Sequence, residues 1–112
     1  MKIDREHAMK LWQERYGFAW YARDFHGNLM QRDRYGDPNA RVLGLRGPEY
    51  VGWNLHHILP RAHGGTNEAH NLICTNIRTN EAAEDKITFW IDDCRYQVRR
   101  IPGTREYEIV SL

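Results

Sequence analysis

The spacing of hydrophobic residues predicts an α-helix at the start of the chain and only short pieces of structure after it. From Ala8 to Tyr16 the hydrophobic residues recur at helical spacing, which places them on one face of a helix. Asp4 is a favourable N-cap, and Gly17 is the kind of residue at which helices often end. Between residues 18 and 50, repeated turn signals cut the pattern into segments that predict short strands and loops.

The last part of the chain has the pattern of β-strands. Segments 87–91 and 95–101 are rich in β-branched and aromatic residues, and the turn-forming pair Asp92–Asp93 separates them. This pattern predicts a hairpin. A last strand over residues 107–110 follows the turn at Pro102–Gly103.

The segment that begins at Trp53 predicts a strand containing two adjacent histidines. Its alternating pattern places His56 and His57 on opposite faces of the strand, and Pro60 ends it. Two neighbours on opposite faces are expected to do different jobs.

A second strand and a helix are expected to follow. Gly64–Gly65 permit a turn with positive φ, and residues 71–74 can return as an antiparallel strand. Asn76 is a suitable cap for a helix in which Asn80 and Glu84 share one face, because they are four positions apart. The segment therefore predicts the order strand, strand, helix.

Four of the six histidines lie within fifteen residues: His56, His57, His63 and His70. Such crowding favours a chemical explanation. His63 and His70 fall in the expected loop between the strands, where a solvated histidine is the ordinary interpretation, although a protonated one suits a phosphate.

The segment resembles the HNH nuclease motif, the ββα-metal unit of small phage and bacterial endonucleases. The residues that carry the resemblance, in the order and spacing of that family, are His56–His57, Pro60, Gly64–Gly65, Asn71–Leu72 and Asn80. The resemblance implies an α+β fold with a ββα-metal (HNH) core over about residues 53–86. An N-terminal helix and a C-terminal β-hairpin complete it, in a single domain over residues 1–112.

The resemblance also implies a role for each of four residues. His57 is the expected general base, and Asn71 is the residue whose amide holds that histidine in position. His56 and Asn80 are the expected ligands of one divalent cation. Glu84 is a further ligand in some members of the family, or else an ordinary glutamate on a helix surface. Without the motif, Asn71 would be interpreted as an asparagine that satisfies its own backbone.

Phosphodiester hydrolysis explains why such residues belong together. The reaction needs an activated water, a cation that stabilises charge on the pentacovalent phosphate, and help for the leaving oxygen. An imidazole with an ordinary pKa of about 6.5 is a competent base at neutral pH. A ligand set of histidine and asparagine fits Mg²⁺, Mn²⁺, Ni²⁺ or Zn²⁺ without choosing among them.

The cysteines indicate that no structural zinc accompanies the motif. Many relatives hold such a zinc with two Cys-x-x-Cys pairs, whereas here Asn76 and Thr79 stand where the second pair would fall. Cys74 and Cys94 are instead expected to be buried thiols. Aromatic packing is expected to brace the motif, with contributions from Trp12, Trp20, Phe89 and Trp90.

The net charge identifies no partner, so a protein of this charge that binds nucleic acid must do so by local placement of basic residues. The chain has 112 residues and a formal net charge of +1, so it lacks an overall basic character. Arginine provides 13 of the 16 basic residues, and a guanidinium binds phosphate oxygens through two parallel hydrogen bonds. The alternative is that these arginines pair with the 15 acidic residues on the surface. The candidates for contact with DNA are Arg61 and Lys86 beside the site, and Arg95, Arg99 and Arg100 along the hairpin. Strand alternation places Arg95 and Arg99 on one face and Arg100 on the other, so at most part of that cluster acts together.

Three functions remain in competition. The leading hypothesis is a metal-dependent endonuclease or nickase that hydrolyses double-stranded DNA, its specificity either low or supplied by a protein partner or self-association. The alternative is a catalytically silent module that keeps the HNH fold to bind nucleic acid or protein. A structural metal protein is disfavoured by the missing cysteine pairs. No hydrophobic run is long enough for a membrane span or a signal peptide, so a cytoplasmic protein is expected.

Overall fold

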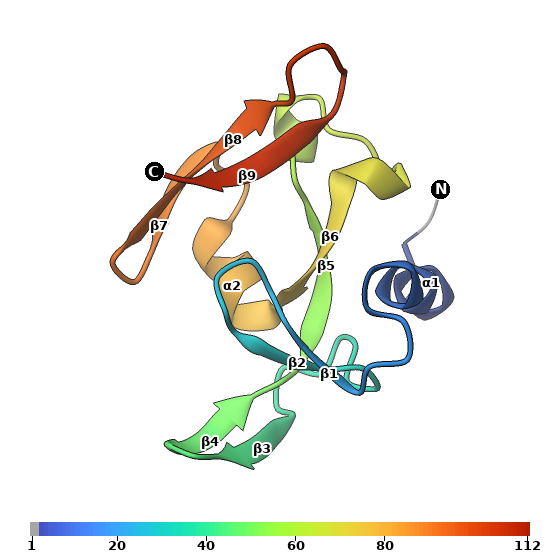
Figure 1. Ribbon diagram of the computed structural model, residues 1–112, viewed down its shortest axis with the longest axis vertical. Coiled ribbons are helices and arrows are strands. Elements are labelled where there is room, and N and C mark those ends of the chain that lie inside the picture. Colours follow the sequence, from blue (N-terminus) through green and yellow to red (C-terminus); the bar gives the residue numbers. More distant parts are fainter. Residues whose placement is uncertain (1–2) are drawn as a thin grey trace.

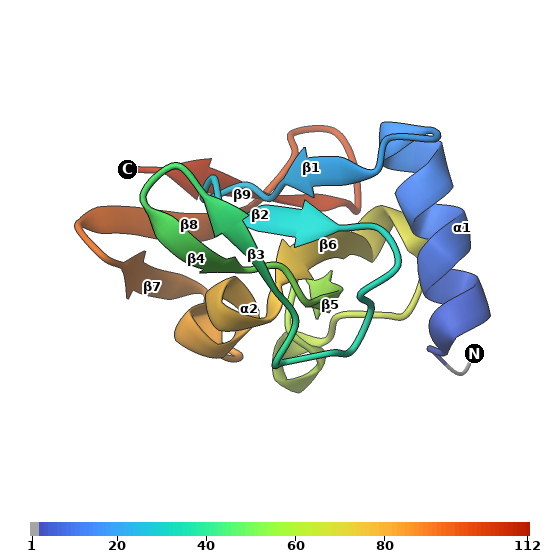
Figure 2. The same cartoon turned by 90° about the horizontal axis from the view of Figure 1, so that it is seen from below.

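The computed structural model describes residues 3–112, whose helices and short strands are arranged as Figure 1 and Figure 2 show. In chain order the elements are α1 (Arg5–Tyr16), β1 (Tyr21–Arg23), β2 (Leu29–Gln31), β3 (Arg41–Gly44), β4 (Gly47–Tyr50), β5 (Trp53–His57), η1 (Arg61–His63), η2 (Ala69–Asn71), β6 (Leu72–Asn76), α2 (Ile77–Ala83), β7 (Thr88–Ile91), β8 (Cys94–Arg100) and β9 (Tyr107–Ser111). None of the helices in this part of the chain is long and hydrophobic enough to cross a membrane.

The strands pair antiparallel in small sheets that follow chain order: β1–β2, β3–β4, β5–β6 and β7–β8–β9. Together with the two α-helices, these sheets confirm the α+β class. The predicted C-terminal hairpin carries a third strand, because β9 pairs along β8 from Tyr107 opposite Arg100 to Ser111 opposite Tyr96.

Helix α1 forms where the sequence predicts it. The Asp4 side chain accepts a hydrogen bond from the His7 backbone N–H at 2.9 Å. At the other end Gly17 adopts a φ of 61° and donates to the Gln13 carbonyl, which closes the last turn. The apolar face of α1 buries Ala8, Leu11 and Trp12.

The main core lies where this face packs against the β5–β6 hairpin. Trp12 and Trp53 are fully buried, and their ring centroids are 4.9 Å apart. Leu72 and Cys74 of β6 are fully buried in the same cluster. Since large aromatic side chains bury the most apolar surface, this contact fixes α1 on the hairpin.

A second cluster lies beneath the C-terminal sheet, and it corrects part of the predicted packing. Phe89 is buried as expected, but Trp90 is 62% exposed because alternation along β7 turns it to the opposite face. Trp20 is also exposed, at 43%, with the Arg32 guanidinium 5.2 Å from its ring centroid. Cys94 is exposed rather than buried, because it begins β8 directly beside a solvent-facing turn.

Helix α2 begins as predicted and ends earlier. The side chain of its N-cap, Asn76, accepts a hydrogen bond from the Arg78 backbone N–H at 2.9 Å. The helix ends at Ala83, because Glu84 has a φ of 52°, in the left-handed region that a helix cannot continue through. Glu84 therefore follows the helix instead of sharing its face with Asn80.

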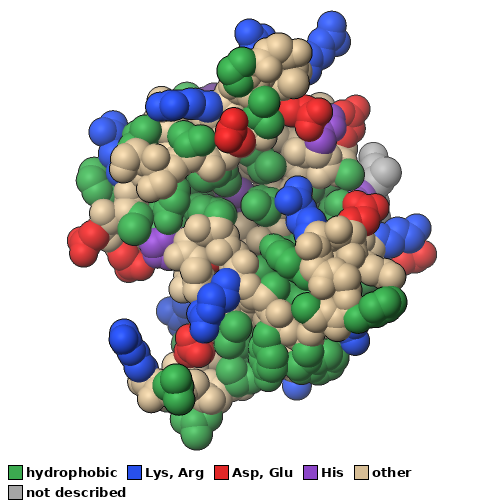
Figure 3. All heavy atoms as spheres, viewed as in Figure 1, with side chains coloured by type: hydrophobic (Ala, Val, Ile, Leu, Met, Phe, Trp, Pro, Cys, Tyr) green, Lys and Arg blue, Asp and Glu red, His purple; other side chains and the backbone are tan. Residues whose placement is uncertain are grey.

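The β3–β4 hairpin projects from the body of the molecule at the bottom of Figure 1, and β5 runs upward away from it. Leu43 and Leu45 at its end are exposed, and Figure 3 shows hydrophobic and basic side chains there.

Candidate functional site

Strand β5 directs its two histidines toward different surroundings, as the alternation predicts. His56 is buried, and its Nδ1 lies 2.5 Å from Oδ1 of Asn80 on α2. His57, half-buried at the end of the strand, places its Nε2 2.7 Å from Oδ1 of Asn67 in the loop before η2. The structure therefore brings His56 and Asn80 together and gives His57 a separate partner.

Asn54 fixes the orientation of the Asn80 amide. Nδ2 of Asn80 donates to Oδ1 of Asn54 at 3.0 Å, so Oδ1 of Asn80 faces His56. The Thr75 hydroxyl donates to the same Asn54 oxygen at 3.4 Å. Asn54 was missed in the sequence, where it is only one polar position in the alternation of β5.

Burial keeps His56 in its neutral form. It lowers the pKa of the His56 imidazole below its ordinary value; the nearby His57 lowers it further, and the hydrogen bond with Asn80 acts in the opposite direction. A neutral imidazole is the form that ligates metals. Ligation through Nδ1 would require the ring proton to reside on Nε2 instead.

The His57 partner, Asn67, also contacts the following turn. Nη1 of Arg61 donates to the same Asn67 oxygen at 3.1 Å. Nothing in the sequence distinguishes Asn67 from other loop asparagines, because its role depends on how the loop folds back onto β5.

Asn71 anchors this loop to the end of β5. Its Oδ1 accepts from the Leu59 backbone N–H at 2.9 Å, and its Nδ2 donates to the carbonyls of Leu59 and Thr66. Gly65 is essential to this closure, since a Cβ there would lie 1.7 Å from the Leu59 carbonyl oxygen. Asn71 therefore contacts the backbone of Leu59, two residues after His57, and acts on His57 by fixing that backbone rather than by a hydrogen bond to its imidazole.

A cleft of about 390 Å³ opens over these residues. Its lining contains both histidines and the helix asparagine together with carboxylates that follow α2: Leu55, His56, His57, Pro60, Arg61, Ala62, Asn80, Glu84 and Asp85. Glu84 thus borders the cleft, although it lies beyond the end of the helix.

The residues present fit a metal held by few protein groups. Within residues 3–112, no group of three or more His, Cys, Asp or Glu side chains is arranged to hold an ion. His56 on the strand donates from Nδ1 to Oδ1 of Asn80 on the helix, and these two atoms would offer one nitrogen and one oxygen donor to a cation with the ring proton on Nε2. A cation bound mainly by water and substrate phosphate needs no more than one or two protein ligands.

The other candidates lie at the rim or away from it. His63 and His70 are exposed, and His70 pairs with Glu68 at 3.4 Å. Lys86 pairs with Glu84 at 3.8 Å. The arginines of β8 are all exposed on the C-terminal sheet: Arg95, Arg99 and Arg100.

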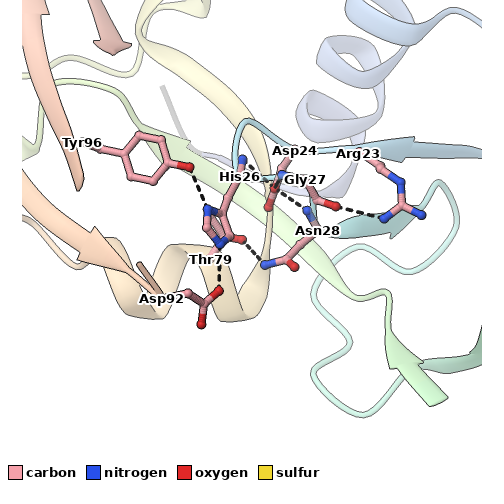
Figure 4. Close-up of polar contacts among 8 residues, drawn as sticks. All are labelled: Arg23, Asp24, His26, Gly27, Asn28, Thr79, Asp92 and Tyr96. Atoms are coloured by element: carbon pink, nitrogen blue, oxygen red, sulfur yellow. Dashed lines mark hydrogen bonds and ion pairs between the residues drawn. The ribbon is translucent and has the colours of Figure 1, made fainter. Parts of the chain in front are cut away.

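A hydrogen-bond network joins Asn76 and Thr79 to the turn between β1 and β2. Oδ1 of the buried Asp24 accepts from three consecutive loop N–H groups, those of residues 26–28, and Oδ2 accepts from the Asn76 N–H at 2.9 Å. The Asn28 amide donates to the Thr79 hydroxyl at 2.8 Å (Figure 4). Polar side chains therefore join the β1–β2 turn to α2.

Comparison of the chain with family models, with curated proteins and with solved structures gives no match.

Proposed function

We propose that this protein is a metal-dependent endonuclease or nickase of the HNH class that hydrolyses phosphodiester bonds of double-stranded DNA. In this proposal β5, β6 and α2 form a ββα-metal core. His57 acts as general base, His56 and Asn80 hold one divalent cation, and Asn71 positions the loop that accompanies the base.

The observation that carries the proposal is the division between two adjacent histidines. His56 is buried against the Asn80 amide oxygen, and His57 is half-buried against a different loop, yet both line the same cleft. One neutral nitrogen beside an oxygen donor suits ligation, and a second imidazole at the cleft suits proton transfer. A hydrolytic site needs both functions within reach of one phosphate.

The chemistry assigns a separate task to each residue. A divalent cation, when bound by His56 and Asn80, supplies charge stabilisation to the phosphate oxygens. The His57 imidazole takes a proton from the attacking water, a contribution typically worth about 10²–10⁴ in rate. The Arg61 guanidinium, exposed at the rim of the cleft, is placed to contact a phosphate of the backbone.

Cleavage of supercoiled plasmid in Mg²⁺, Mn²⁺, Ni²⁺, Zn²⁺ or EDTA tests the proposal. We expect the wild-type protein to convert the plasmid to nicked or linear forms with at least one metal and to leave it intact in EDTA. His57→Ala should lose this activity by about 10²-fold or more.

His63→Ala is the matched control, because it removes an exposed histidine from η1 without changing the cleft lining. It should cut at the wild-type rate. Plasmid binding without cleavage in any metal would instead support the catalytically silent module, and equal cleavage by the two variants would contradict the role of His57.

A further inference from the structure

The loop beside His57 contains an arrangement that the proposed division of labour does not use. A single oxygen, Oδ1 of Asn67, lies 2.7 Å from His57 Nε2 and 3.1 Å from Arg61 Nη1. Asn67 is half-buried, ten residues beyond His57, in the loop that Asn71 ties to the backbone after β5.

Arg61 determines which atom of the Asn67 amide faces His57. A guanidinium has only donors, so the amide atom that it contacts must be the oxygen and not the nitrogen. Because His57 contacts that same atom, its Nε2 must be the donor in this hydrogen bond. A neutral imidazole carries one proton, and that proton is therefore on Nε2.

We propose that Asn67 is a positioning residue that fixes the His57 ring in the Nε2–H tautomer and leaves Nδ1 as the proton acceptor. An amide oxygen does this without adding a negative charge to the cleft, unlike a carboxylate in the same place. The role of Nδ1 in taking a proton from water rests on the proposed nuclease function, whereas the tautomer does not.

Long-range ¹H–¹⁵N NMR of the histidine rings reads the tautomer directly. Spectra are recorded as the pH is raised and are compared on the alkaline plateau, where the ring signals no longer change. The spectrum of His57→Gln assigns the His57 signals by difference. We expect a protonated Nε2 and an unprotonated Nδ1 in the wild-type protein, and the Nδ1–H tautomer there would overturn the proposal.

Substitution of the acceptor supplies the second measurement. Asn67→Leu removes the oxygen at similar size, and we expect the two His57 nitrogen shifts to move toward an average of both tautomers. Asn67→Asp keeps an oxygen and should retain separate shifts. Glu68→Gln is the matched control. It changes the residue after Asn67, whose side chain pairs with His70 and not with His57, so the His57 shifts should stay as in the wild type. An unchanged spectrum in Asn67→Leu would contradict the proposal, and the wild-type tautomer decides it if that variant fails to fold.

Cleavage kinetics then separate this inference from the proposed function. We expect Asn67→Leu to lower kcat about tenfold to hundredfold with DNA affinity unchanged, and Asn67→Asp to recover most of the lost kcat. A loss of DNA affinity with unchanged kcat would overturn the positioning role. If the wild-type protein cuts no DNA, the nuclease proposal falls while the NMR result still decides the tautomer.

Discussion

Two histidines joined by one peptide bond meet different environments, and their expected contributions differ accordingly. His56 has lost most of its contact with water and faces an amide oxygen, whereas His57 keeps partial exposure beside a polar loop. Substituting each one therefore tests a different property of the site.

Titration calorimetry tests the proposed division between two metal ligands and a general base. His56→Ala and Asn80→Ala should each weaken Mn²⁺ binding by tenfold or more, because each removes one of only two protein donors. His57→Ala should leave the affinity within about twofold, since its imidazole is not a ligand in this scheme. Equal affinity in all three variants would contradict this division.

The two cysteine thiols should differ in reactivity because their burial differs. Burial raises the pKa of Cys74 to about 12, with the nearby Arg15 opposing it, so almost no thiolate exists at pH 8. Cys94 is exposed. A colorimetric disulfide reagent should titrate one thiol per native chain and two in denaturant, and Cys94→Ser should abolish the native reaction. Rapid labelling of Cys74 in the folded protein would contradict its placement.

At the scale of elements, Asp24 connects parts of the chain that are far apart in sequence. Its carboxylate joins the β1–β2 turn to the backbone at the start of α2, and His26 in the same turn bridges Tyr96 and Asp92 in the C-terminal sheet (Figure 4). These contacts hold the start of α2, the helix that carries Asn80, against the β1–β2 turn.

Asp24→Ala should lower the free energy of unfolding by about 2–4 kcal/mol, because it leaves backbone donors without their charged acceptor. Asp93→Ala, which removes an exposed carboxylate from a turn, is the control and should change stability by about 0.5 kcal/mol or less. Urea denaturation measures both. Similar midpoints for the two variants would show that the network contributes little.

The elements that the sequence predicted are those encoded by local signals. The caps of α1 and the alternation of β5 are properties of neighbouring residues, and both appear where expected. The early end of α2 at Glu84 could not be foreseen, since no glycine or proline marks it. The contact of Asn67 with His57 likewise depends on a loop closing across ten residues, so no local pattern contains it.

At the scale of the whole molecule, apolar packing and polar networks together hold the described part of the chain. One aromatic cluster joins α1 to β5, and a second lies beneath the C-terminal sheet around Phe89 and Tyr96. The network at Asp24 lies between α2 and the β1–β2 turn. Packing and hydrogen bonds therefore hold α2 in position.

Prolonged dialysis against EDTA should leave the protein folded. A structural zinc would contribute its binding free energy to folding, whereas packing and hydrogen bonds are insensitive to chelation. We expect the circular dichroism spectrum and the Tm to agree before and after dialysis. Collapse of either would reveal a structural metal and would overturn the expectation drawn from Asn76 and Thr79.

Salt dependence should show how the molecule holds DNA. With a net charge of +1 the chain can neutralise few phosphates, so we expect weak affinity and a slope of log K against log salt equivalent to about three to five contacts, at about −0.9 each. Arg61→Gln, at the cleft, should reduce the slope by about one unit and lower affinity on every sequence alike. Arg99→Gln on β8 should do the same.

Arg46→Gln, in the β3–β4 turn at the far end of the molecule, is the control and should leave the slope unchanged. Affinity lost on one sequence only would mean that Arg61 reads bases, and an unchanged slope would mean that it does not touch DNA.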